Sequence, residues 1–303
     1  MAADFKTLKE ILIRFTHGDS KLYGPDMATL GRYEYFHKFL SRVEEGVLDA
    51  ITFHHYYSAS TNITSNNFTS VPYLDSFIHY GETALNTIAQ SITKFKIPPI
   101  RIGETSSTYG GGSPDVGESF SASFLWLDKL GLAAQFNINS VMRQSLKGGF
   151  YSLVDHDYNP CVDYWVSLLY KQLVGTKVLN VTGFLEYNRT VRAYAHCVNV
   201  GNERGYESTG TITVFVLNMN ETEQAEIQLE GSLGDLEGDS FVFTSATGDM
   251  DSRLVKLNGE VLKMINDEDL PELLPLRVEQ PFVLPPLSYG FFILDASGSI
   301  DCS

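Results

Sequence analysis

The residue best placed to do chemistry is Glu104. It ends an apolar, strand-like stretch, Ile100-Arg101-Ile102-Gly103-Glu104, and is followed by a glycine-rich turn, Tyr109-Gly110-Gly111-Gly112. An acid at the carboxyl end of a parallel strand is where (β/α) barrels carry their catalytic groups. Such a carboxylate can attack an anomeric carbon, in chemistry that also needs a second acid. The second acid should lie on an earlier strand, and we find no equally good candidate for it in this chain.

The alternation of side chains along a strand predicts which residues would accompany Glu104. Successive side chains point to opposite faces, so Ile102 and Glu104 would share a face. If Ile102 points into a barrel, Glu104 lies one layer above it, at the mouth. By the same rule His54 and Tyr56 would border that mouth, whereas His55 would pack among helices.

Gln144 follows the last expected strand of this part of the chain and would also lie at the mouth. Amide and imidazole groups bind sugar hydroxyls, so the set suits carbohydrate chemistry. Other interpretations stay open. Glu104 could be a solvated loop residue, and the glycine run could be only a flexible turn. The adjacent His54-His55 could be a metal pair, although neighbouring strand residues diverge.

Two halves of the chain differ in pattern. Residues 1–175 alternate between helical and strand-like stretches, which is typical of βα units and a parallel sheet. We expect helices near 5–15, 30–43, 74–92, 120–131 (ending at Gly131) and 162–169, and strands at 21–26, 49–55, 99–104 and 137–142. Four such strands are half of an eight-stranded barrel.

Residues 176–303 carry short β-rich runs separated by turn formers, which predicts an antiparallel β-sandwich. We expect strands at 191–198, 211–217, 226–229, 241–243 and 289–294. Asn258-Gly259 is a strong hairpin signal between short apolar runs.

Composition limits the classes of function. The formal net charge of −15 and the pI of about 4.8 disfavour nonspecific nucleic-acid binding. The sequence has no uninterrupted stretch of about 18 apolar residues, so we expect no membrane span. The N-terminus does not have the pattern of a signal peptide. The absence of a C-x-x-C pair makes structural zinc improbable. Five N-x-S/T sequons favour a secreted protein; they lie at Asn62, Asn67, Asn180, Asn188 and Asn220.

These motifs together resemble the heparanases of glycoside hydrolase family 79, which are retaining endo-β-glucuronidases. The resemblance covers nearly the whole chain from about residue 20. It rests on the Gly-Glu-Thr-Ser-Ser and Tyr-Gly-Gly-Gly runs around Glu104 and on several further motifs: Lys21-Leu22-Tyr23-Gly24-Pro25-Asp26, Phe53-His54-His55-Tyr56-Tyr57, Val141-Met142-Arg143-Gln144, Asp163-Tyr164-Trp165 and Tyr289-Gly290-Phe291-Phe292.

The resemblance implies a (β/α)₈ barrel plus a β-sandwich, an enzyme that cleaves heparan sulfate or a related glycosaminoglycan, and no metal or organic cofactor. Glu104 matches the nucleophile, and Cys197 and Cys302 match a disulfide, whereas Cys161 has no counterpart. The loop around Gly149 is one residue shorter than in the family. Positions matching the substrate cleft are His54, Tyr56, Gly110, Gly111, Gln144, Gly149 and Tyr151.

The chain also departs from the family pattern. The acid/base glutamate of the family lies in an Asn-Glu-Pro motif, but neither Asn202-Glu203 nor Asn220-Glu221 is followed by Pro. We therefore expect this chain to be the C-terminal portion of such a protein, with the signal peptide upstream and the acid/base on a separate N-terminal segment. A secreted, extracellular-matrix or lysosomal location is implied.

The chain has fewer basic residues at the positions expected near the substrate than the family pattern has. After the Tyr-Gly-Pro-Asp motif only Arg32 is kept, and Ser58-Ala59-Ser60-Thr61 lacks the family's arginine. A less sulfated glucuronide is therefore a possible substrate. The rival hypothesis is a non-catalytic heparanase-like protein that binds glycans or proteins. The inactive relatives lose the Gly-Glu acid, which this chain keeps as Gly103-Glu104.

Overall fold

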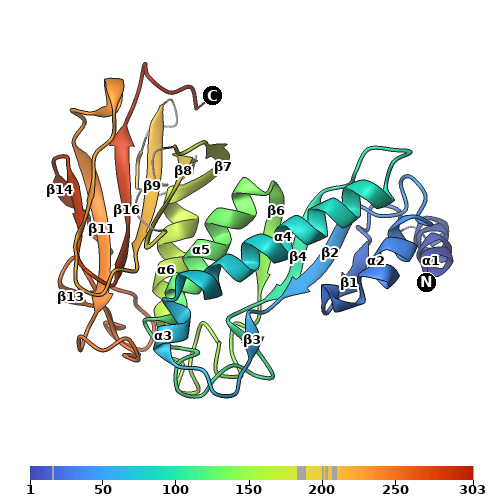
Figure 1. The fold of residues 1–303 in the computed structure, drawn as a ribbon, viewed down its shortest axis with the longest axis horizontal. Helices are drawn as coiled ribbons and strands as arrows, with labels where there is room; N and C mark the ends of the chain where they lie inside the picture. The colour runs from blue at the N-terminus through green and yellow to red at the C-terminus, as the bar shows by residue number, and fades with distance from the viewer. Residues whose placement is uncertain (16, 183–188, 200, 202–203, 207–209, 303) are drawn as a thin grey trace.

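The computed structural model describes residues 1–15, 17–182, 189–199, 201, 204–206 and 210–302. A parallel sheet in the first half of the chain and an antiparallel sheet in the second half lie on either side of a layer of helices (Figure 1). The predicted fold class, an α/β barrel portion followed by an antiparallel β region, is therefore confirmed.

The parallel sheet has four strands in the order β1-β2-β4-β6. Each begins and ends within two residues of its predicted position. The strands are β1 (Tyr23–Met27), β2 (Ala50–His55), β4 (Ile100–Thr105) and β6 (Ile138–Arg143), with a short parallel pair, β3 (Ser58–Ala59) and β5 (Thr108–Tyr109), beyond their carboxyl ends. The helices are α1 (Ala2–Arg14), α2 (Tyr33–Leu40), α3 (Ser65–Phe68), α4 (Val71–Ser91), α5 (Ala122–Gln135) and α6 (Val162–Leu173), with a 3₁₀ turn, η1 (Leu30–Arg32).

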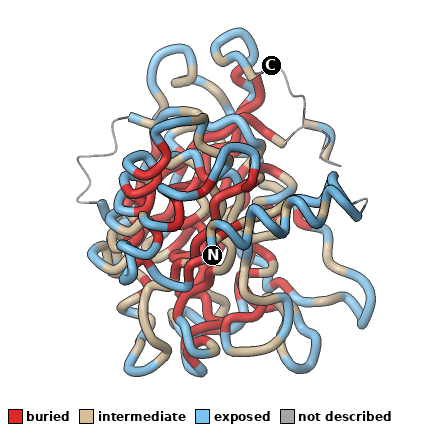
Figure 2. The backbone as a smooth tube through the Cα atoms, turned by 90° about the vertical axis from the view of Figure 1, so that its right-hand side faces the viewer, coloured by how far each residue is buried: buried red, intermediate tan, exposed pale blue. Residues whose placement is uncertain are grey.

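One face of the parallel sheet packs on the helices. Phe53 of β2 contacts the rings of Phe36 from α2 and Tyr80 from α4, at centroid distances of 6.5 and 6.2 Å. Ile102 pairs with Phe53 and is likewise fully buried in this core. Helix α1 differs, because it has no buried residue and is exposed over most of its length in Figure 2.

Helix α5 continues past Gly131, where we expected it to end. The ring of Tyr194, from strand β8 (Val191–Val198), lies 2.3 Å from the position that a Cβ on Gly131 would occupy. Gly131 is therefore a contact site inside the helix and not a terminator. It lets α5 approach the antiparallel sheet closely, which local sequence pattern does not show.

The antiparallel sheet has eight strands, with order β13-β12-β11-β16-β9-β8-β7 and β14 pairing with β11. Asn258 and Gly259 both have positive φ and connect β12 to β13, so the predicted hairpin is confirmed. Besides β8, the strands are β7 (Val174–Leu179), β9 (Thr211–Asn218), β11 (Gly238–Ser245), β12 (Val255–Leu257), β13 (Glu260–Val261), β14 (Leu276–Val278) and β16 (Ser288–Asp295).

Both faces of this sheet are covered. Its inner face presents Tyr194, Phe215 and Phe291 to the core that α5 and α6 share. Its outer face is covered by a separate pair of strands, β10 (Ala225–Ile227) and β15 (Phe282–Leu284), and the rings of Phe282 and Phe292 stack at 4.8 Å. The second layer of the sandwich is thus only two strands wide, with a 3₁₀ turn, η3 (Gly231–Leu233), beside it.

A disulfide joins Cys197 of β8 to Cys302 in the C-terminal tail, as the family resemblance implied. The bridge spans 105 residues, and a loop of that size corresponds to about 4.7 kcal/mol in the chain-entropy model. Cys161 is free and buried, and burial followed by the nearby Glu118 raises the pKa of its thiol to about 12.

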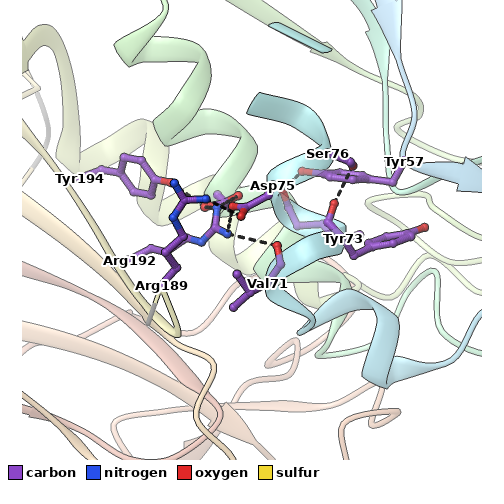
Figure 3. A network of polar contacts seen from close by, with 10 residues as sticks. Tyr57, Val71, Tyr73, Asp75, Ser76, Arg189, Arg192 and Tyr194 are labelled. Atoms are coloured by element: carbon purple, nitrogen blue, oxygen red, sulfur yellow. Dashed lines mark hydrogen bonds and ion pairs between the residues drawn. The ribbon is translucent and has the colours of Figure 1, made fainter. Parts of the chain in front are cut away.

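A buried ion network fastens the parallel half to the antiparallel sheet (Figure 3). Arg192 of β8 donates to Asp128 of α5 at 3.0 Å and to Asp75 of α4 at 2.6 Å. The hydroxyl of Tyr194 donates to the same Asp128 carboxylate at 2.5 Å. Because removing one member of a buried pair leaves an uncompensated charge, these contacts hold α4, α5 and β8 in one arrangement.

Within the described residues, no helix is long and apolar enough to cross a membrane.

His55 is a buried titratable group on the helix-facing side of β2. Its ring lies 4.7 Å from the rings of Phe77 and Tyr80, and only 3% of the residue is exposed. Burial, and then the charge of Lys129, lowers the pKa of His55 well below its usual 6.5. A histidine whose pKa is depressed by folding stabilises the protein fully above the unfolded pKa and loses that contribution as pH falls.

We therefore expect His55→Phe to make the protein less sensitive to acid. Between pH 6.5 and 5.0, protonation of His55 in the unfolded state should remove about 2 kcal/mol from the free energy of unfolding of the wild type. The variant should lack this loss in urea unfolding at the two pH values. His79→Phe, at an exposed position, is the control and should keep the wild-type dependence. Equal losses in His55→Phe and the wild type would contradict the prediction.

Candidate active site

The candidate site lies at the carboxyl ends of β2 and β4. The hydroxyl of Tyr56 donates a hydrogen bond of 2.7 Å to Oε1 of Glu104. Nδ1 of His54 lies 3.8 Å from the same oxygen. The Glu104 side chain is 37% exposed, so a ligand can reach a carboxylate that the protein already holds from one side.

The Glu104 side chain faces the site for a different reason from the one that strand alternation predicts. Ile102 does not point into the barrel, because it faces the helices with Phe53. The pairing of β2 and β4 then shifts by one residue, from Phe53–Ile102 to His54–Glu104. This irregularity at Gly103 turns Glu104 toward the same side as His54 and Tyr56. The location predicted for Glu104 is the one observed, but the expectation about Ile102 was wrong.

Gly103 makes room for an acid that sequence reasoning missed. A Cβ on Gly103 would lie 2.0 Å from Oδ1 of Asp26, at the end of β1. The other oxygen of Asp26 lies 3.1 Å from Nε2 of His54. Asp26 is the acid of the Tyr-Gly-Pro-Asp motif and lies one residue before the end of a parallel strand. An acid near the carboxyl end of a parallel strand was the signal that identified Glu104, so the same signal could have identified Asp26.

The glycine-rich loops carry Tyr151 toward the site. The Tyr151 ring lies 6.4 Å from that of Tyr56, and the loop around it contacts the loop after β5. The backbone N–H of Phe150 donates to the carbonyl of Gly111 at 2.6 Å. A Cβ on Gly149 would lie 2.8 Å from that carbonyl oxygen, so the close approach of the two loops requires glycine here.

Two of the predicted site residues are less directly connected to Glu104. The backbone N–H of Gln144 donates to the carbonyl of Thr105, next to Glu104, at 2.8 Å. Gly110 is exposed and has a φ of +88°, and the atom nearest its missing Cβ is Oγ of Ser60. The structure therefore brings His54, Tyr56, Glu104 and Tyr151 together and puts Gly110, Gly111, Gln144 and Gly149 in the loops beside them.

A buried lysine supports the segment that follows Glu104. Lys129 of α5 donates to Oγ1 of Thr105 at 2.6 Å and to the carbonyl of Ser106 at 2.8 Å. Burial, and then the charge of Arg143, lowers the pKa of the Lys129 ammonium well below its usual value. Sequence reasoning missed Lys129, because a lysine in a helix is usually a surface residue.

Arg143 connects β6 to the Tyr151 loop. It donates to the carbonyl of Tyr151 at 2.7 Å and forms an ion pair of 2.6 Å with Asp163 of α6. Its guanidinium also lies over the Trp126 ring at 4.7 Å. These contacts fix the backbone that presents Tyr151.

The environment of Tyr56 keeps its hydroxyl a donor. Burial, followed by the hydrogen bond to Glu104, raises the pKa of Tyr56 well above its usual value of 10. A phenol that stays protonated can stabilise a neighbouring carboxylate without competing for its role as a nucleophile. The arrangement can therefore present Glu104 to an electrophilic carbon.

The alternative of a metal pair at His54-His55 does not fit the geometry. His54 faces Asp26 and Glu104, whereas His55 faces Phe77 and Tyr80 on the opposite side of the sheet. Among the residues that the structure describes, no group of three or more His, Cys, Asp or Glu side chains is arranged to hold a metal ion.

Comparison with known proteins agrees with this geometry. Residues 1–131 match the family described as glycosyl hydrolase family 79, N-terminal domain. The chain is 37% identical to heparanase from Bos taurus over 97% of its own length and 54% of that protein. The chain is a heparanase-like protein of glycosyl hydrolase family 79.

Other relatives carry names that indicate different functions. The heparanase-like chain is 30% identical to hyaluronoglucuronidase from Hirudo nipponia, over 99% of its length and 60% of that protein. It is 31% identical to inactive heparanase-2 from Homo sapiens, over 100% of its length and 52% of that protein. It thus spans about half the length of these curated relatives.

A solved structure shares the fold at low sequence identity. A 4-O-α-L-rhamnosyl-β-D-glucuronidase from Fusarium oxysporum superimposes with a TM-score of 0.62 at 12% identity. The match covers 96% of this chain and 63% of the other. At this identity the likeness establishes the fold alone.

Proposed function

We propose that this heparanase-like chain carries the nucleophile of a retaining glycoside hydrolase that cleaves β-glucuronide linkages in heparan sulfate or a related glycosaminoglycan. The observation that carries the proposal is the Glu104 carboxylate, partly exposed at a strand end and held by the hydroxyl of Tyr56. The heparanase and hyaluronoglucuronidase relatives support the class of substrate.

In this mechanism an oxygen of Glu104 attacks the anomeric carbon while the bond to the leaving oxygen breaks. A second carboxyl group, about 5–5.5 Å away, protonates that oxygen and later removes a proton from the water that releases the sugar. We propose that a separate N-terminal segment supplies this acid/base. The substrate-binding set would be His54, Tyr56, Gly110, Gly111, Gln144, Gly149 and Tyr151.

The rival proposal is a non-catalytic protein that binds glycans or proteins, a class to which inactive heparanase-2 points. The contact between Tyr56 and Glu104 favours the enzyme, because a binding protein does not need an aligned, exposed carboxylate at a strand end. A chain that binds a glucuronide without reacting at Glu104 would favour the rival.

A secreted, extracellular-matrix or lysosomal location is part of the proposal. The disulfide between Cys197 and Cys302 supports it, because such bridges persist in oxidising compartments. The sequons add to it: Asn62 and Asn180 are exposed, and Asn67 and Asn220 are partly buried, whereas Asn188 lies outside the described residues.

We predict that a mechanism-based glucuronide inactivator, applied to the chain together with an acid/base segment, will label Glu104. Mass spectrometry of the peptides should find the added mass on this residue, because it is the proposed nucleophile. Glu104→Gln should abolish the label. Tyr56→Phe should slow labelling by about tenfold or more, since a hydrogen bond to a charged group contributes about 1.5–3 kcal/mol. A label on any other residue would refute the assignment.

We also predict that residues 1–303 alone will be inactive or nearly so. General acid–base assistance contributes about 10²–10⁴-fold, and the proposed acid/base is not among these residues. The measurement is turnover of a fluorogenic glucuronide and of heparan sulfate with and without an added N-terminal segment. Turnover by the chain alone that equals that of the mixture would contradict both this prediction and the assignment of the second acid to a separate segment.

Heparin binding should be weak for a member of this family. The net charge of −15 repels a sulfated polyanion, and only Arg32 remains of the expected basic cluster. We expect elution from a heparin column at low salt. Retention to about 1 M salt, where surface charges are screened beyond about 3 Å, would show that local cations outweigh the overall charge.

A further inference from the structure

Asp26 is a charged group at the site to which the proposed chemistry gives no role. It lies one residue before the end of β1 and has a φ of +56°, and its side chain is 52% exposed. One carboxylate oxygen lies 3.1 Å from Nε2 of His54, while the other ring nitrogen of His54 lies 3.8 Å from Glu104. The imidazole therefore lies between two carboxylates from different strands.

The contact between Asp26 and His54 has the distance of an ion pair, but it lacks the alignment of a hydrogen bond. Nε2 is shielded from solvent, and no other group donates to it or accepts from it within the described residues. Hydrogen bonds in unliganded active sites are often poorly aligned and tighten when the substrate binds. A small rotation of the His54 ring would align Nε2–H with the carboxylate.

The backbone of β4 is adapted to this placement of Asp26. Gly103 does not have a positive φ, so conformational freedom does not explain the glycine. Instead, the carboxylate of Asp26 occupies the space of a side chain at position 103, with Oδ1 only 2.0 Å from an ideal Cβ. Any other residue there would push Asp26 away from His54.

A carboxylate accepts hydrogen bonds only, so an imidazole nitrogen within hydrogen-bonding distance of it, as Nε2 is at 3.1 Å, must carry the proton. In neutral His54 this makes Nε2 the donor and leaves Nδ1 an acceptor beside Glu104. The gap of 3.8 Å between Nδ1 and Oε1 of Glu104 is too long for a direct hydrogen bond. A single hydroxyl group placed there could donate to either atom.

We propose that Asp26 is a positioning residue: it fixes His54 so that Nδ1 accepts a hydrogen bond from a sugar hydroxyl beside Glu104. The substrate part of this inference rests on the proposed function, but the effect of Asp26 on His54 does not. Tyr80 of α4 donates to the backbone carbonyl of His54 at 2.7 Å, so the strand stays in place when Asp26 is changed.

The first experiment observes the His54 ring directly. In the chain labelled with ¹⁵N-histidine, one of the seven histidines should show a slowly exchanging Nε2–H signal that His54→Gln removes. Asp26→Ala should remove it through loss of the acceptor, and Gly103→Ala should remove it by displacing the acceptor. Asp235→Asn, at an exposed acid in the antiparallel half, should keep it. Near-ultraviolet circular dichroism checks that each variant is folded.

The second experiment is a double-mutant cycle on the rate at which a glucuronide inactivator labels Glu104 in the chain with its acid/base segment. Asp26→Ala should slow labelling about tenfold in the wild-type background and have no further effect when His54→Gln is already present. An equal effect in both backgrounds would show that Asp26 does not act through His54 and would overturn the proposal.

The remaining outcomes separate the two proposals. Persistence of the Nε2–H signal in folded Asp26→Ala overturns the positioning role, whatever Glu104 does. If Asp26→Ala loses the signal but Glu104 is not labelled in the wild type, the positioning of His54 is supported and the proposed function is refuted. Restoration of turnover in Asp26→Ala by azide would make Asp26 the acid/base and would also overturn the positioning role.

Discussion

The burial of helix α5 between two sheets is the constraint on which the rest of the structure depends. Two adjacent charged residues of this helix, Asp128 and Lys129, are almost completely buried. They face different partners: Asp128 accepts from Arg192 and Tyr194 of the antiparallel sheet, and Lys129 donates to Thr105 and Ser106 after Glu104. A polar or ionisable group removed from water is tolerated only when its hydrogen bonds are made, so both sets of partners must be in place together.

This arrangement couples the loop after Glu104, at the candidate site, to a sheet that contributes no predicted substrate-binding residue. The position of Glu104 depends on the loop that Lys129 holds, and the position of Lys129 depends on a helix that Asp128 and Gly131 fasten to β8. The outer face of the antiparallel sheet is covered by β10 and β15. The sheet thus acts through its inner face, as a support for the helices behind the site.

Sequence pattern predicted the elements well because most of their signals are local. The four parallel strands lie within two residues of their predicted positions, and the hairpin at Asn258-Gly259 follows from backbone preference alone. It was wrong about Ile102, because alternation cannot reveal an irregularity that depends on the neighbouring strand. It was also wrong at Gly131, where the reason for glycine is a ring 63 positions later in the chain, Tyr194.

The candidate site was only partly predictable for the same reason. Glu104, His54 and Tyr56 could be grouped because each lies at or just beyond the end of a recognisable strand, and Asp26 carries the same signal. Lys129 could not be found in this way, because it matters through contacts between a helix and a strand that no local pattern contains. The family resemblance supplied the disulfide, which spacing alone could not assign.

The side-by-side fit of Gly131 and Tyr194 also limits how this protein can be rearranged. A chimera that exchanged the antiparallel sheet for that of another hydrolase would bring a new side chain to the surface of α5 at the point where the helix has no Cβ. It would also leave the buried Asp128 carboxylate without its partner, Arg192. The natural unit for recombination is therefore not the antiparallel sheet alone. It is that sheet together with helix α5, which lies between it and the parallel sheet in Figure 1.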